Sequence, residues 1–228
     1  MPAFRANLLL SLILAFLSGY IDTAVFVHMG GLFVAHVTGN FVLLGATVAG
    51  LESVGHGSST VLQLISFPLF FLSAALAGGV SGRLSKDSQT LLLLFLSALL
   101  ITGIGAACLS PSIPDTIASM GLVVAMAWLN AAHRLDSRLG APFTVMTGNV
   151  TGIALELAYT LKIGKREETP NTTKPNASPK FRMLYLVLSF AVGCALGALS
   201  QRAYGLETML LPGFVLVLGL LSITLRRP

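Results

Sequence analysis

Residues 33–40 read Phe33-Val-Ala-His-Val-Thr-Gly-Asn40, and the closing Thr-Gly-Asn returns in Met146-Thr-Gly-Asn149. Each tripeptide lies in the first half of an apolar segment, Leu32–Leu51 and Pro142–Leu161. Gly permits a tight backbone turn, and Thr and Asn cap the N–H groups at a helix start well. The pattern therefore predicts two re-entrant or broken segments, with helices beginning after Asn40 and Asn149.

A second pair of similar stretches extends the repeat. Ala74-Ala-Leu-Ala-Gly-Gly-Val-Ser-Gly-Arg83 resembles Gly193-Cys-Ala-Leu-Gly-Ala-Leu-Ser-Gln-Arg202. The chain therefore divides into repeat one, 1–112, and repeat two, 113–228, within one membrane domain, 1–228. A polar linker, 164–181, interrupts repeat two. With three crossings in each half, the second repeat inserts upside down relative to the first, a plan that recurs in transporters.

The composition is that of an integral membrane protein. Hydrophobic residues make up 54% of the 228 residues and charged residues 10%, with a mean hydropathy of +0.84. A soluble domain has about 25% charged residues. The net charge of +5 does not indicate nucleic-acid binding, because the Lys and Arg residues lie at the ends of apolar runs. Cys108 and Cys194 lie inside apolar segments, which indicates packing rather than a disulfide.

The apolar runs predict an all-α, polytopic membrane helix bundle. Six are long enough to cross a bilayer, which takes about 20 residues: Leu8–Met29, Val61–Gly82, Leu91–Leu109, Thr116–Ala132, Leu184–Ser200 and Met209–Leu225. Lys and Arg concentrate on the cytoplasmic side of membrane proteins. Six full spans plus two re-entrant segments place both termini inside and leave only Arg202 on the opposite face.

Several motifs together resemble the YoaK-like family, small bacterial membrane proteins of unknown function. They are Gly19-Tyr-Ile-Asp22, Phe33–Asn40, Asn130-Ala131 and Met146–Asn149. Residues 126–131 read Met-Ala-Trp-Leu-Asn-Ala, where the family pattern is Met-Gly-Leu-Gln-Asn-Ala. The resemblance covers nearly the whole chain and implies six transmembrane helices in the bacterial inner membrane, without an established activity.

Polar residues within apolar segments are the candidate binding residues. Asp22 is the most informative, because an Asp inside a spanning helix costs about 2.5–3.5 kcal/mol on insertion scales. It either relays a proton or cation or accepts a hydrogen bond from a substrate, or it caps a kink near the outer end of the helix. The predicted substrate-binding or transport set near the bilayer midplane is Asp22, Thr38, Gly39, Asn40, Asn130, Thr147, Gly148 and Asn149.

Three further residues are candidates for gating or titration: Tyr20, His133 and Glu156. Glu156 could equally lie near the cytoplasmic interface and pair with Lys162 or Arg166. We expect no metal site, because His28 and His36 lack ligand spacing and an accompanying Cys or carboxylate cluster. No catalytic motif and no cofactor fingerprint is present.

These features favour a small-solute permease or channel, in which two helix starts hold a polar or anionic solute. A non-catalytic assembly or sensor protein is the alternative, and a membrane-embedded lipid enzyme a further one. Beyond the lipid bilayer and the solute, a second copy of the chain could pack through small-residue pairs such as Gly78–Gly82 and Gly193–Gly197, which equally allow packing within the bundle.

Overall fold

The computed structural model describes residues 8–51, 60–110, 113–139, 143–144, 146–163 and 182–225. Within these residues the secondary structure is entirely helical, so the all-α prediction is confirmed. The linker 164–181 lies outside them. The helices are α1 Leu8–Met29, α2 Val37–Val48, α3 Thr60–Ser81, α4 Lys86–Ala107, α5 Asp115–Leu135, η1 Ser137–Leu139, α6 Thr147–Thr160, α7 Arg182–Tyr204, η2 Gly205–Met209 and α8 Leu210–Leu225.

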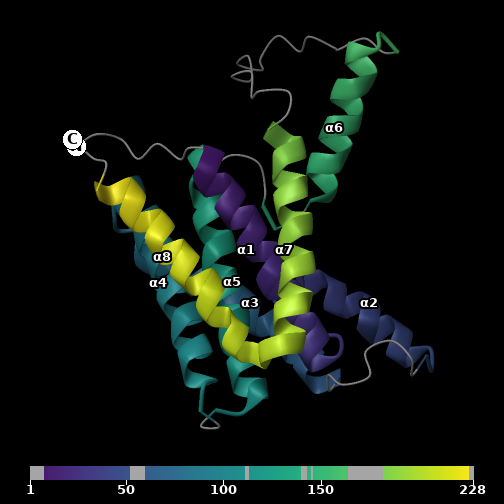
Figure 1. The fold of residues 1–228 in the computed structure, drawn as a ribbon, viewed down its shortest axis with the longest axis vertical. Helices are drawn as coiled ribbons and strands as arrows, with labels where there is room; N and C mark the ends of the chain where they lie inside the picture. The colour runs from purple at the N-terminus through teal and green to yellow at the C-terminus, as the bar shows by residue number, and fades with distance from the viewer. Residues whose placement is uncertain are drawn as a thin grey trace.

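The long apolar helices agree with the membrane protein that the composition predicts. Among the described residues, five helical segments are long and apolar enough to cross a membrane: α1, α3, α4, α5 and the 41-residue segment Arg182–Ser222. The last segment contains α7, η2 and most of α8. It turns back at η2, where Gly205 has a φ of +59°, so α7 and α8 form two separate limbs (Figure 1). By contrast, α2 and α6 have 12 and 14 residues, about 18 and 21 Å of helix, less than the roughly 30 Å of a bilayer core.

Helix α1 lies at the centre of the bundle and packs closely on α7 (Figure 1). A Cβ atom added at Gly193 or Gly197 would lie 2.1 or 2.3 Å from the carbonyl oxygen of Phe16 or Tyr20. Gly19 of α1 faces Phe190 of α7 in the same way. These glycines bring two backbones into direct contact, which is how membrane helices associate without a hydrophobic driving force between them. The predicted close packing of Gly193 and Gly197 therefore operates inside the bundle.

Helices α1 and α5 run in opposite directions. His28 near the end of α1 lies 2.9 Å from Asp115 at the start of α5. At the other end, the hydroxyl of Ser11 donates to the carbonyl of Leu139, just after α5. The first helix of each predicted repeat thus points the opposite way from its counterpart.

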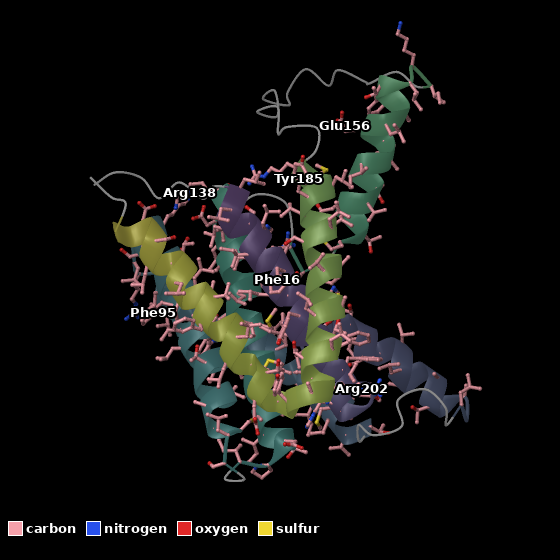
Figure 2. The ribbon with its side chains drawn as sticks, viewed as in Figure 1. Phe16, Phe95, Arg138, Glu156, Tyr185 and Arg202 are labelled. Carbon is pink, nitrogen blue, oxygen red and sulfur yellow. The ribbon has the colours of Figure 1, made fainter. Side chains whose placement is uncertain are left out.

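The described basic residues gather at one end of the bundle. Arg138 after α5 forms an ion pair of 2.6 Å with Asp87 at the start of α4, and Arg182 at the start of α7 contacts Ser11 of α1. Arg138 and Arg202 lie at opposite ends (Figure 2). The charge pattern predicts Arg138 and Arg182 on one face of the membrane and Arg202 on the other, and these three residues lie at the two ends of the bundle in that way. Arg5, Arg226 and Arg227 lie outside the described residues.

A buried carboxylate, Asp136, lies beside Arg138 at this end of the bundle. Thr90 and the guanidinium of Arg138 both donate to it, at 2.8 Å and at 2.8 and 2.7 Å. Burial alone would raise the pKa of Asp136, but the hydrogen bonds from Arg138 and Thr90 outweigh burial and lower it. The same contacts raise the pKa of Arg138.

We expect the stability contributed by Asp136 to depend on pH. A lowered pKa in the folded state means that the contribution is complete above the unfolded pKa of about 4 and is lost as the pH falls below it. Thermal unfolding of the purified protein and of Asp136→Asn, compared at pH 7 and at about pH 3, tests this. The variant should be less stable at pH 7, and the difference should shrink in acid. An equal difference at both pH values would contradict it.

Candidate functional site

The first break, residues 30–36, interrupts the chain between α1 and α2. Gly30 and Gly31 have φ values of 63° and 119°, a region that favours glycine, and they end α1. The carboxylate oxygen Oδ1 of Asp22 then accepts the backbone N–H groups of Val34 at 2.8 Å and Ala35 at 2.7 Å. Asp22 is 4% exposed, so the chain that folds back over it supplies its hydrogen-bond donors. This geometry agrees with the structural alternative for Asp22, a carboxylate that caps a kink.

Asn40 holds the other side of the first break. Its amide pairs with the backbone of Phe33 in both directions, accepting from the N–H and donating to the carbonyl at 2.9 Å each. The same amide donates to Ser66 of α3 at 2.8 Å. One turn earlier on α3, Gln63 donates to the carbonyl of Gly31 at 3.0 Å. Two polar residues of α3, both buried, thus fix the first break.

The second break, residues 136–146, separates α5 from α6, and its described part is 136–139, 143–144 and 146. Asn130 of α5 accepts a hydrogen bond from the Thr144 hydroxyl at 2.7 Å and donates to the carbonyl of Met126. Asn149, also buried, donates to the sulfur of Met146 at 3.2 Å. Each break is therefore tied to the long helix that precedes it, by Asp22 in the first case and by Asn130 in the second.

The helix starts differ from the prediction. Helix α2 begins at Val37 and α6 at Thr147, so the Thr-Gly-Asn residues form the first turn and do not precede it. Neither helix has a side-chain cap. In α2, the Asn40 amide bonds to the backbone of Phe33 instead. Gly39 is needed for packing: a Cβ there would lie 2.8 Å from the Phe33 ring, whereas a Cβ at Gly148 would meet nothing within 4 Å.

The two threonines of the repeat are accessible. Thr38, Thr147 and Gly148 are exposed at the first turns of α2 and α6, while Gly39 is half-buried. The first N–H groups of an α-helix have no partner within the helix, and they carry partial positive charge. The exposed threonine hydroxyls lie beside two such uncapped helix starts, where a polar or anionic ligand would be stabilised.

His36 contacts the second carboxylate oxygen of Asp22. Its Nδ1 atom lies 2.6 Å from Oδ2 of Asp22. The ring stacks edge-on against Phe190 of α7, at 5.8 Å between centroids.

Sequence reasoning missed His36 and Thr144 as members of the site. His36 was considered only as a metal ligand, although an ionisable residue inside a membrane segment is itself a functional signal. Thr144 offered no comparable signal, because its role depends on contacts with residues far away in the sequence. Gln63 and Ser66, three residues apart in an otherwise apolar stretch, share one helix face and could have been identified.

The three candidates for gating were Tyr20, His133 and Glu156. The hydroxyl of Tyr20 bonds to Thr208 in η2, and the ring of His133 packs edge-on against Phe143 at 5.1 Å. Glu156 lies on the half of α6 that extends away from the bundle (Figure 2), and α6 itself continues past the start of α7 (Figure 1). The contacts named for Tyr20 and His133 are made to residues outside the first break.

Comparisons with known proteins give a family but no activity. No curated protein and no solved structure matches the chain. A family model described as "Protein of unknown function (DUF1275)" matches residues 10–222, nearly the whole chain. This match is consistent with the resemblance to the YoaK-like proteins of unknown function. The chain therefore belongs to the DUF1275 family, whose function is not established.

Proposed function

We propose that the protein is a small-solute permease or channel whose binding site lies between the first turns of α2 and α6. The observation that carries this proposal is the pair of uncapped helix starts with exposed threonines, Thr38 and Thr147. Helix N-termini favour anions and electron-rich polar groups. The solute is then a small anion or a polar neutral molecule, and bare cations are repelled.

The proposal includes an inverted repeat with six crossings. Helices α1 and α5 run in opposite directions, and α7 and α8 are two limbs of one long apolar segment. The short helices α2 and α6 enter and return on opposite faces in this arrangement. Discontinuous helices at the interface of inverted repeats form the binding site in many transporters. Rocking of one repeat against the other then exposes the site to each side of the membrane in turn.

The positive-inside rule gives the orientation that we propose. The end that carries Arg138 and Arg182 faces the cytoplasm, so both termini are cytoplasmic, and the membrane is the bacterial inner membrane. We propose no catalytic role for the site, since the carboxylate of Asp22 is bound by two backbone N–H groups and one imidazole.

The second candidate function is a non-catalytic assembly or sensor protein. It is favoured by the hydrogen bonds of Asp22 and Asn40, which are made to the protein itself at the first break. A break that is closed by its own side chains needs no solute to stabilise it. A bound partner protein that copurifies in fixed stoichiometry would favour this function.

A flux measurement with threonine variants tests the permease. Proteoliposomes are mixed with a hyperosmotic solution of one solute at a time, from a panel of small anions and polar neutral molecules, and recovery of volume is followed by light scattering. At least one solute should enter faster than into protein-free liposomes. Thr38→Val and Thr147→Val should each slow that entry about fivefold, because one hydrogen bond contributes about 1 kcal/mol.

Thr47→Val and Thr160→Val are matched controls at the far ends of the same two helices. There the hydroxyls bond to the carbonyls of Leu43 and Glu156 within the helix. Flux should be unchanged in both. Flux that falls equally in all four variants, or entry no faster than into empty liposomes across the panel, would overturn the proposal.

A further inference from the structure

We propose that two copies of the chain associate in the membrane through the faces of α2 and α6, and that this contact covers the first turns of both helices. The inference goes beyond the proposed function, because it depends on the cost of leaving two helix starts open to lipid and not on transport. Under the proposed function, the solute site then lies between two copies and is incomplete in one.

The first turn of α2 lies deep within the bundle. His36, which directly precedes α2, lies 2.6 Å from Asp22 and packs edge-on against Phe190 at 5.8 Å between ring centroids. Asp22 is seven residues before Met29, the end of α1, and Phe190 is eight residues after Arg182, the start of α7. At 1.5 Å per residue, the start of α2 is about 10 Å inside the end of α1 and about 12 Å inside the start of α7.

The first turn of α6 also lies inside the bundle. A Cβ atom added at Gly152 would lie 2.8 Å from the sulfur of Met183, the second residue of α7. Thr147, the first residue of α6, is five residues before Gly152, and α6 runs from there past the start of α7 (Figure 1). Thr147 is therefore about 8 Å deeper than Met183. Both starts are at the depth of the hydrocarbon core, which is about 30 Å thick.

The first turns of α2 and α6 present polar groups at this depth. Neither start has a side-chain cap, and the first N–H groups of a helix have no acceptor within it. Thr38 and Thr147 are exposed, and within the described residues neither hydroxyl has a hydrogen bond. By contrast, Thr47, Thr151 and Thr160 each donate to the carbonyl four residues earlier. The two threonines at the starts cannot do so, because no helical turn precedes them.

Lipid does not satisfy these groups. An unpaired backbone N–H group is costly in hydrocarbon, and a helix start at that depth is found where protein or a water-filled cavity covers it. Helices α2 and α6 project from the same side of the bundle (Figure 1), so one partner can cover both starts. None of the exposed residues of the two helices is charged, which suits a partner inside the membrane. A Cβ at Gly45 or Gly148 would meet no atom within 4 Å, which leaves room for another helix to approach closely.

A second copy of the chain fits this face because the face is self-complementary. A threonine hydroxyl both donates and accepts, and its oxygen is a good acceptor for the N–H groups of a helix start. The face thus carries the donors that need a partner, together with two acceptors that can serve them, Thr38 and Thr147. A two-fold axis along the membrane normal keeps each group at its own depth, so these donors and acceptors meet in two copies that use the same face.

Counting photobleaching steps in liposomes tests the association. The full-length protein carries one fluorophore at Leu99→Cys, in a Cys108→Ser, Cys194→Ser background. Leu99 is 58% exposed on α4, which lies on the side of the bundle away from α2 and α6 (Figure 1). Two steps should prevail and give way to one step as the protein is diluted in lipid. One step at every dilution would mean that the helix starts face water in a monomer, and would overturn the proposal.

Threonine variants of the same labelled protein test the interface. Thr38→Val and Thr147→Val should each raise the dissociation constant of the dimer about tenfold, because a two-fold interface loses the same contact twice. Thr47→Val and Thr160→Val are the matched controls, since their hydroxyls are bonded within the helix, and they should leave the dissociation constant unchanged. An unchanged dimer in both variants at the helix starts would overturn the proposal.

Gly79→Leu tests a rival interface, the small residues Gly78–Gly82 of α3. Gly79 is exposed, and a Cβ there would meet no atom within 4 Å of the same chain, so the larger side chain disturbs only a contact with another molecule. The dissociation constant should not change. A dimer that is weakened by Gly79→Leu and not by the threonine variants would place the interface on α3 and overturn the proposal.

Subunit counting does not use flux, so the two proposals fail separately. A monomer that transports a solute removes the interface and leaves the permease. A dimer that is weakened by Thr38→Val and Thr147→Val, in a protein without flux, removes the permease and leaves the interface.

Discussion

Gly197→Ala is expected to destabilise the protein by about 3 kcal/mol, near the upper end of the usual cost of overpacking. The added Cβ would lie 2.3 Å from the carbonyl oxygen of Tyr20 and 2.9 Å from its Cα. These are backbone atoms of the buried central helix, so no side chain can rotate to make room. Helices α1 and α7 must then separate, and contacts along both are lost. The effect is measured by heating the detergent-solubilised variant and recording the fraction of protein that remains in the monodisperse peak.

The matched control is Gly78→Ala on α3. Gly78 is the position that aligns with Gly197 in the sequence repeat, yet a Cβ there would meet no atom within 4 Å. Alanine also has a helix propensity about 1 kcal/mol better than glycine. The control should therefore be as stable as the original protein or slightly more so. Equal losses of stability in the two variants would mean that the α1–α7 contact at Gly197 is no tighter than the surroundings of Gly78.

This asymmetry shows what local patterns in the sequence can and cannot give. Small residues recur in both halves, and the sequence predicted that each set packs closely. Of the two sets, only the one on α7 meets the backbone of another helix, the buried central helix α1. The set on α3 lies on an exposed face, where Leu76 and Val80 beside Gly78 are 66% and 70% exposed. A small residue permits close approach, but the partner that makes the approach comes from elsewhere in the chain.

The helices themselves were predictable, since apolar runs longer than the bilayer core have few alternatives to a helix. All six predicted spans correspond to helices α1, α3, α4, α5, α7 and α8. The two breaks were also located by their Thr-Gly-Asn motifs. The sequence therefore contained the elements of the fold, while the number of full crossings and the inverted repeat stay predictions.

The details of the breaks were less predictable because they depend on contacts between distant residues. Asn40 was expected to cap a helix, yet Gly30 and Gly31 turn the chain so that the Phe33 backbone comes within its reach. His36 gains its role from Asp22, which lies on the other side of the turn at Gly30 and Gly31. Helix propensity and hydrophobic periodicity describe neighbouring positions in the sequence, so they carry no information about contacts between these segments.

Asp22→Ala should have the other large effect, a loss of about 3–5 kcal/mol, the usual cost of removing one partner of a buried ion pair. The substitution leaves the N–H groups of Val34 and Ala35 without their acceptor, and it leaves Nδ1 of His36 without its carboxylate partner. Each buried donor that loses its partner costs about 1–3 kcal/mol. The first break should then open, so thermal unfolding should shift downward and proteolysis near residues 30–36 should accelerate.

Asp115→Ala is the control, because it removes the same side chain from the ion pair with His28 at the other end of α1. The side chain of Asp115 is 60% exposed against 5% for Asp22, and water screens an exposed pair to about 0–1 kcal/mol. Asp22→Asn should lie between the two. Its amide oxygen still accepts the N–H groups of Val34 and Ala35, but the atom that faces His36 becomes an NH2 group, which cannot accept a hydrogen bond. If Asp22→Ala loses no more stability than Asp115→Ala, the carboxylate of Asp22 does not hold the first break in place. Its contact with His36 would then add no stability to the fold.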